Sequence, residues 1–281
     1  MTRLERHIQC QQSGSSTIDC LKQSVSSLSV AELKKALKFG AVWLERGGKI
    51  KRSRRAKMPL IEGDLLHLYY DSEILSAQTP DARLVADEGD YSIWDKPCGM
   101  YSQGTKWGDH SSICRWIEMF GCEKYQLGER QAYLVHRLDR ATSGLIVVAH
   151  KKKVTQKLAR LFEDRKVEKR YQAIVHGHFP DSILRLEADI DGKVALTEIL
   201  ENHFDPTSNC STLKINLATG RKHQIRKHLA DANFPIVGDR LYGEKVDVGK
   251  DIVELNSNLR LRCLYLSFPC PVSGDLKCYS G

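Results

Sequence analysis

The sequence predicts an α+β protein in two parts: a small basic α/β module, followed by a larger mixed domain centred on a sheet. Three observations support this fold class. The chain has 281 residues, of which 41% are hydrophobic, so it is long enough for two packed cores. Apolar residues alternate in some stretches, as in strands, and recur every three to four residues in others, as in helices. Finally, the positive charge is concentrated in one early window.

This basic window runs from Ala31 to Leu60. The whole chain has 43 Lys and Arg against 35 Asp and Glu, a net charge of +8, and the window alone, with ten basic and two acidic residues, has the same excess. Leu33 and Leu37 fit a helix, Gly47-Gly48 fits a turn, and residues 65–70 fit a strand. A folded scaffold that presents many cations can contact the phosphates of an RNA backbone. The alternative is that these cations only form a charged surface exposed to solvent. The expected RNA contacts in this window are Lys34, Lys35, Lys49, Lys51, Arg52, Arg54 and Arg55.

The rest of the chain mixes strands and helices. Residues 73–90 are mainly polar, contain Pro80 and Gly89, and are typical of a linker. The patterns that follow predict a buried strand at 143–149, an amphipathic helix from Val154 to Phe162, strands at 171–175 and 213–217, a hairpin turn at Asp191-Gly192, and a helix at 225–232.

The sequence contains no membrane-spanning apolar run, and its first residues lack the apolar stretch of a secretory signal. Its nine cysteines include no Cys-x-x-Cys pair, which argues against a disulfide framework and against a usual structural zinc site. We therefore expect free thiols, no metal, no membrane association and a cytoplasmic location.

One polar segment stands out among apolar neighbours, from Tyr133 to Leu145. It places Asp139 between Arg137 and Arg140, just before the predicted buried strand. Flanking cations favour the ionised carboxylate, which can act as a nucleophile, a general base or a metal ligand. The alternative is that Asp139 caps a turn with Thr142 and Ser143.

A second segment, from Thr219 to Leu229, joins a predicted strand to a predicted helix, with Thr219 as the expected helix cap. It carries the guanidinium groups of Arg221 and Arg226. Because an unpaired buried charge is costly, a carboxylate is the natural partner for an arginine on the buried edge of this helix. A solvated basic helix is the alternative.

These segments together resemble the pseudouridine synthases of the RluA type. The family motif His-Arg-Leu-Asp-x-x-Thr-Ser-Gly matches residues 136–144, and Gly-Arg-x-His-Gln-(Leu or Ile)-Arg-x-His matches residues 220–228. A basic-x-Tyr motif is met by Lys169-Arg170-Tyr171, and Asn-Lys-Pro-x-Gly appears as 95–99 with Asp95 in place of Asn. A second departure lies at 261–271, where Leu261-Arg262-Cys263 stands in place of Leu-His-Ala. The resemblance covers about Tyr91 to Phe268.

The resemblance implies a mainly antiparallel catalytic sheet and an isomerase that converts uridine to pseudouridine in RNA without a cofactor. Asp139 would be the nucleophile, attacking either the sugar or the base, and Arg226 would pair with it. Tyr171 would stack on the flipped uracil, and its hydroxyl would help to remove the proton from carbon 5, unless Tyr171 is simply a core aromatic of the strand.

Base flipping leaves a gap in the RNA stack, and Arg137 is placed to fill it. Four further residues are expected to contact RNA, Lys151, Lys152, Arg221 and His223, although the lysines would equally suit a solvated helix start.

Residues 24–72 loosely resemble the S-four-type RNA-binding module, through Gly40-Ala41-Val42, Gly47-Gly48-Lys49 and Gly63-Asp64. The predicted organisation is therefore a tail at 1–23, this module at 24–72, a linker at 73–90 and a catalytic domain at 91–281. This module favours ribosomal over transfer RNA as substrate, and we expect the protein to act as a monomer.

Other functions fit less well. A non-catalytic RNA-binding or ribosome-assembly protein of the same fold has no need of Asp139 and its motif neighbours. A protein kinase is excluded because its catalytic loop lacks the inserted Leu138 and its glycine loop is missing. A metal-dependent nuclease lacks an acidic cluster beside His223 and His228.

Overall fold

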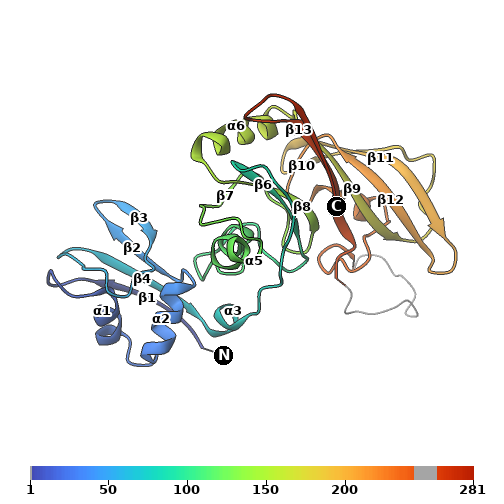
Figure 1. Ribbon diagram of the computed structural model, residues 1–281. Coiled ribbons are helices and arrows are strands. Elements are labelled where there is room, and N and C mark those ends of the chain that lie inside the picture. Colours follow the sequence, from blue (N-terminus) through green and yellow to red (C-terminus); the bar gives the residue numbers. More distant parts are fainter. Residues whose placement is uncertain (1, 244–257) are drawn as a thin grey trace. The chain divides into compact units, whose positions relative to one another are not determined.

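The computed structural model describes residues 2–243 and 258–281, which form two compact units (Figure 1). Unit 1 comprises the chain up to Thr79 together with Gln103–Trp116. Unit 2 comprises Pro80–Ser102 and the chain from Ile117 onward. Within the described residues, none of the helices has the length and apolar character needed to cross a bilayer.

Unit 1 is built on a four-stranded antiparallel sheet in the order β1-β4-β2-β3. The strands are β1 (Arg3–Gln9), β2 (Val42–Arg46), β3 (Lys49–Arg52) and β4 (Leu65–Asp71). Gly47 and Gly48 both have positive φ, 56° and 70°, which is the backbone that a tight two-residue hairpin between β2 and β3 requires.

The first part of unit 1 contributes the helices α1 (Thr17–Ser24), α2 (Val30–Lys38) and α3 (Ser72–Ser76), and segment 103–116 adds a short fourth helix. Ser16 caps α1, and Ser29 forms a capping box with Glu32 at the start of α2. Leu33 and Leu37 of α2 are fully buried in one core with residues of the sheet. The helix predicted from this leucine spacing is confirmed.

Two predicted boundaries are wrong. Residues 1–23 are not a tail, because β1 pairs with β4 along its whole length and α1 packs into the core. Residues 73–90 are not a plain linker, because they contain most of α3 and the strand β5 (Arg83–Asp87). Both segments lack a strong apolar period: in β1 only Leu4 and Ile8 are apolar.

Two arginines of the basic window have structural partners within unit 1. Arg52 lies 3.2 Å from the Asp109 carboxylate and donates a hydrogen bond to the Thr105 carbonyl oxygen at 2.7 Å. Arg54 donates to the same carboxylate. These guanidiniums hold segment 103–116, which ends in α4 (Ile113–Trp116). Arg52 and Arg54 thus have a structural role within unit 1, and their contact with RNA stays a prediction.

Unit 2 contains a ten-stranded, mainly antiparallel sheet, as predicted. Its main path is β10-β11-β12-β9-β13-β8-β6-β5, with β14 beside β13 and β7 beside β8. The strands not yet bounded are β6 (Tyr91–Lys96), β7 (Tyr133–Leu134), β8 (Ser143–Ala149), β9 (Glu168–His176), β10 (Arg185–Ile190), β11 (Lys193–Asp205), β12 (Cys210–Leu217), β13 (Leu261–Pro269) and β14 (Leu276–Ser280). The pairing of β8 with β13 is parallel.

The helical segments of unit 2 are η1 (Ile117–Gly121), α5 (Cys122–Lys124), α6 (Lys152–Glu163) and α7 (Gln224–Asp231). Helix α6 packs against β8 and buries Val154 and Leu158, whereas α7 packs against β10 and β11. The predicted amphipathic helix, the buried strand β8 and the hairpin at Asp191-Gly192 are confirmed.

The close approach of β8 to β13 requires a glycine at position 144. Gly144 has a φ of +107°, and a Cβ atom placed there would lie 2.2 Å from the carbonyl oxygen of Cys263. Both the backbone conformation and the available space therefore exclude a side chain.

Replacing Gly144 with Ala should lower the free energy of unfolding by at least about 2 kcal/mol, because it adds backbone strain to a steric clash. Urea denaturation measures this change. Gly220→Ala is the matched control, since Gly220 has no positive φ and no atom lies within 4 Å of the place that its methyl group would occupy. We expect this control to change stability by no more than about 0.5 kcal/mol. Equal stability of the two variants would contradict this account of position 144.

Candidate active site

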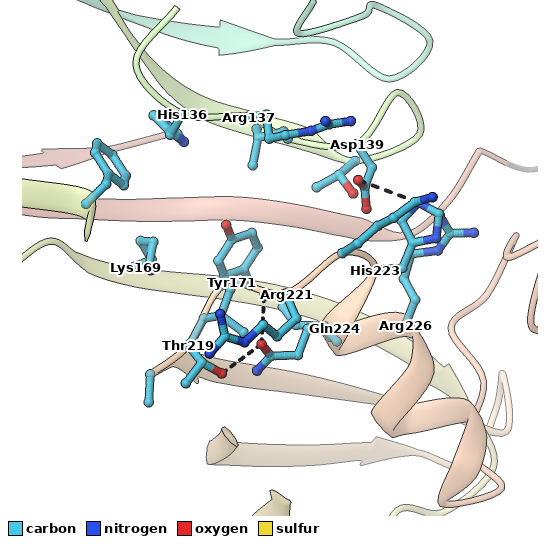
Figure 2. A pocket seen from close by; sticks show the side chains of 18 of the residues that line it. His136, Arg137, Asp139, Lys169, Tyr171, Thr219, Arg221, His223, Gln224 and Arg226 are labelled. Carbon is cyan, nitrogen blue, oxygen red and sulfur yellow. Dashed lines mark hydrogen bonds and ion pairs between the residues drawn. The ribbon is translucent and has the colours of Figure 1, made fainter. Parts of the chain in front are cut away.

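A cavity of about 510 Å³ in unit 2 brings together the two long sequence motifs. Its walls come from the loop before β8, from β9, and from the turn between β12 and α7. Asp139, Tyr171 and Arg226 all line it, and Figure 2 shows their side chains around the same space.

The loop that carries Asp139 is fixed by backbone hydrogen bonds. The Ser102 hydroxyl donates to the Leu138 carbonyl oxygen at 2.6 Å and accepts from the Leu138 N–H at 3.0 Å. The Gly99 N–H donates to the carbonyl oxygen of Arg140 at 2.8 Å. The loop is thus held on both sides of Asp139 by the segment that follows β6.

The Asp139 carboxylate faces the cavity, with 22% of the side chain exposed. It lies 3.6 Å from Nε2 of His223, whose Nδ1 is 2.9 Å from the Tyr242 hydroxyl. The Thr142 N–H bonds to the Asp139 backbone carbonyl, not to its carboxylate. The carboxylate is therefore not used to cap this turn.

Arg226 has a different partner from the one predicted. Its guanidinium donates two hydrogen bonds to Asp239, at 2.7 and 2.6 Å, and both side chains are almost fully buried. Burial opposes the charged form of Arg226, but the bonds to Asp239 and the nearby charge of Asp139 raise its pKa overall. The predicted direct pairing with Asp139 is wrong: Arg226 lies in the field of Asp139 but hydrogen-bonds elsewhere.

Tyr171 is 7% exposed and presents its ring to the cavity from β9. Burial raises the pKa of Tyr171 well above its ordinary value, and the neighbouring Cys263 and Asp139 raise it further. Cys263 lies opposite Tyr171 on the neighbouring strand β13. At neutral pH this side chain is an uncharged phenol.

The turn between β12 and α7 has its own hydrogen-bond network. The Thr219 hydroxyl donates to Oε1 of Gln224 at 2.8 Å and accepts from the Leu196 N–H at 2.9 Å. Helix α7 starts at Gln224, after His223 in a left-handed conformation with φ 56°. The prediction of Thr219 as the helix cap is wrong, because its hydroxyl fixes the turn to β11 instead.

The other predicted RNA contacts in unit 2 lie in two places. Arg137, Arg221 and His223 line the cavity, and the Arg137 side chain is exposed. Lys151 and Lys152 are exposed at the start of α6, where Lys151 is 2.6 Å from Asp90. These lysines are not among the residues that line the cavity.

Sequence reasoning assigned no role to several residues that shape the site. Asp239 follows Gly238 in a segment without a motif, so nothing in the sequence pointed to it. Lys96 was visible within the Asp-Lys-Pro-Cys-Gly segment. It is fully buried and donates to the Met100 carbonyl oxygen at 2.9 Å; burial lowers its pKa to about 8, while Cys98 and Asp139 act in the opposite direction.

The two departures from the family pattern contact each other. Arg262 donates to the Asp95 carboxylate at 2.7 Å, and Arg83 lies 3.3 Å from the same oxygen. Asp95 is on β6 and Arg262 on β13, so their ion pair spans the intervening strand β8. The two changes in sequence thus form one interaction.

We expect Asp95→Asn and Arg262→His each to lower the free energy of unfolding by about 1 kcal/mol, because each leaves one charge of the pair without its partner. The double variant removes both charges and should recover most of this loss. A double-mutant cycle of urea denaturation measures the coupling. Additive losses would mean that the two departures are independent.

The comparisons with known proteins agree with this geometry. The sequence profile of the RNA pseudouridylate synthase family matches residues 90–231. The chain is 30% identical over 216 residues to an uncharacterized RNA pseudouridine synthase of Helicobacter pylori (strain J99), covering 71% of this chain and 70% of the relative. It is 29% identical to the ribosomal large subunit pseudouridine synthase D of Borreliella burgdorferi, covering 70% of this chain and 66% of the relative.

Among solved structures, the human RNA pseudouridylate synthase domain containing 1 has the same fold, with a TM-score of 0.56 at 21% identity, covering 73% of this chain and 84% of that one. Fold and site together define an RNA-modifying isomerase. The chain belongs to the RNA pseudouridylate synthase family, with the motifs of the RluA type. It converts uridine to pseudouridine in RNA, which disfavours a purely RNA-binding protein.

Proposed function

We propose that the chain isomerises uridines in structured RNA, with Asp139 as the nucleophile and the target nucleotide flipped into the cavity. The position of the Asp139 carboxylate, partly exposed within a cavity that also holds Tyr171, carries this proposal. In the reaction, the bond between C1′ of the ribose and N1 of the base breaks. The base turns, a bond forms between C1′ and C5, C5 loses its proton and N1 gains one, and the temporary bond between Asp139 and the substrate breaks again. Attack of Asp139 on the sugar and on the base are both compatible with its position.

Arg226 acts as an electrostatic support for this nucleophile. Its guanidinium is fixed by two hydrogen bonds to buried Asp239, so the cation keeps its place when charge on Asp139 changes. His223, 3.6 Å from Asp139, links the carboxylate to Tyr242.

Tyr171 provides a stacking platform for the flipped uracil. The ring belongs to a buried side chain on β9, so stacking requires little further loss of side-chain freedom. Because the raised pKa keeps the phenol protonated at neutral pH, we assign to Tyr171 the stacking role and not that of the base that takes the C5 proton.

Extruding a stacked nucleotide costs a few kcal/mol, and contacts to the remaining RNA offset this cost. Arg137 is exposed at the edge of the cavity and fits the gap that the flipped base leaves. Arg221, His223, Lys151 and Lys152 would contact the phosphates that flank the target nucleotide.

Unit 1 is proposed to bind RNA as an S-four-type module. Of the RNA contacts predicted in this unit, Lys34, Lys35, Lys49, Lys51 and Arg55 are exposed, whereas Arg52 and Arg54 are partly buried. The name of the Borreliella burgdorferi relative favours ribosomal over transfer RNA as the substrate. We further propose that the protein is a monomer and acts in the cytoplasm, a reducing compartment that suits its nine free thiols.

Asp139→Asn should abolish pseudouridine formation and leave RNA affinity within a few-fold, because the amide keeps the shape of the side chain but is not a nucleophile. Carbodiimide mapping of total RNA from cells with and without the gene locates the target. Adding back the wild-type gene should restore the missing sites, whereas the Asp139→Asn gene should not. Restoration by the variant would refute the role of Asp139, and sites confined to transfer RNA would overturn the ribosomal preference.

The double variant Lys49→Gln/Lys51→Gln should reduce the slope of log affinity against log salt by about 1.5, because two phosphate contacts are lost. Both lysines are exposed on β3, and neither forms an ion pair within the part of the chain that the structure describes. Filter binding across a salt series measures the slope. Lys22→Gln on α1 removes one exposed charge outside the basic window and serves as control; an equal effect per charge would show that the window has no special role.

A further inference from the structure

The cavity extends beyond Tyr171, away from Asp139. In Figure 2, Lys169 and His136 lie on one side of the Tyr171 ring, and Asp139 and His223 lie on the other. Lys169 precedes Tyr171 by two residues on β9, so both side chains leave the same face of the strand. The two ends of the cavity therefore have different chemistry: a carboxylate at one end and an ammonium at the other.

Among residues 2–243 and 258–281, no carboxylate oxygen lies within ion-pair distance of the Lys169 ammonium. Glu163 lines the same end, but it is exposed and not paired with Lys169. Burial lowers the pKa of Lys169, Cys263 opposes this effect and Arg165 adds to it. A half-buried cation without a partner lowers the stability of the fold. A lysine of this kind that lines a cavity is therefore a candidate for contact with a ligand.

The surroundings of Lys169 suit a flat ring. His136 stacks on Phe162 with ring centroids 4.3 Å apart. Its Nε2 accepts the Val147 N–H at 2.9 Å, and burial lowers the pKa of His136 to about 3, so the imidazole is neutral. This end of the cavity thus combines neutral aromatic walls with the half-buried ammonium of Lys169, and the exposed side chains of Glu163 and Arg165 also line the cavity.

We propose that Lys169 donates a hydrogen bond to the carbonyl oxygen of uracil that lies opposite the glycosidic bond, and thereby selects uracil over cytosine. This inference rests on the proposed function, because it requires a flipped base between Asp139 and Lys169. The base stacks on Tyr171 with its sugar toward Asp139, so its far edge points toward Lys169. The phosphates stay with the backbone outside the cavity.

The symmetry of uracil makes this position useful in both halves of the reaction. In the six-membered ring, C4 lies opposite N1 and C2 lies opposite C5. Before the reaction the sugar is attached to N1, so Lys169 meets O4. After the base has turned, the sugar is attached to C5, and Lys169 meets O2. One donor therefore serves both substrate and product.

The same position discriminates against cytosine. Cytosine has an amino group on C4, and its two N–H donors would face the three N–H donors of the Lys169 ammonium. Neither side would be satisfied in a partly dehydrated site, so cytosine would be rejected.

The test uses a synthetic RNA stem-loop that contains the mapped target, prepared with uridine or with 4-thiouridine at that position. Sulfur is a weaker hydrogen-bond acceptor than oxygen. With uridine RNA, Lys169→Met should lower kcat/KM about 10-fold or more. With 4-thiouridine RNA, the wild type should already be slower, and the variant should lose no more than about 2-fold further. Lys169→Arg keeps a donor and should recover part of the activity on uridine RNA.

Lys166→Met is the matched control, because it removes one exposed cation that does not line the cavity, and its activity should equal that of the wild type. Circular dichroism and thermal unfolding confirm that each variant is folded. An equal loss with both RNAs, or a loss confined to RNA affinity with a smaller salt dependence, would overturn the role of Lys169. Failure of the wild type to convert the uridine RNA would instead overturn the proposed function.

Discussion

The backbone contact between β8 and β13 at Gly144 and Cys263 is the constraint on which the site depends. It sets four residues in register on one face of the sheet, Lys96, Gly144, Cys263 and Tyr171, on four neighbouring strands. Lys96 and Tyr171 lie at the two ends of this row, and Gly144, which has no side chain, lies between them beside Cys263. Asp139 comes five residues before Gly144, so the same contact fixes the end of its loop. On the opposite face, Asp95 and Arg262 join the strands on either side of β8.

Charge is divided between structural pairs and groups that face the cavity. Arg226 is neutralised by Asp239 at close range, which leaves the Asp139 carboxylate without a bidentate partner of its own. A carboxylate locked in such a pair would have to break it before attacking a substrate. Holding the arginine with a second acid separates the support of Asp139, our proposed nucleophile, from the reactivity of its carboxylate.

The sequence was sufficient for the elements with strong periodicity and for the members of the long motifs. The leucine spacing of α2, the apolar run of β8 and the motif residues Asp139, Tyr171 and Arg226 are visible in the sequence alone. It was insufficient where partners are distant in the chain. Nothing in the sequence marks Asp239 as the partner of Arg226, and β1 has too few apolar residues to be recognised before its pairing with β4 is known. The window of cations likewise does not reveal that Arg52 and Arg54 hold Asp109, because a sum of charges does not show their partners.

An enzyme that turns its substrate's base must hold the base without preventing the turn. If uracil stacks on Tyr171, as we propose, a turn of the base within its own plane keeps the two ring faces in contact. Hydrogen bonds to the base are directional, so a rigid fork of donors would favour one orientation. Lysine has a compact ammonium on a flexible stem with three rotatable donors, whereas arginine presents a planar fork. At position 169, a lysine therefore suits the contact that we propose, in which one carbonyl oxygen of uracil leaves and the other takes its place within one catalytic cycle.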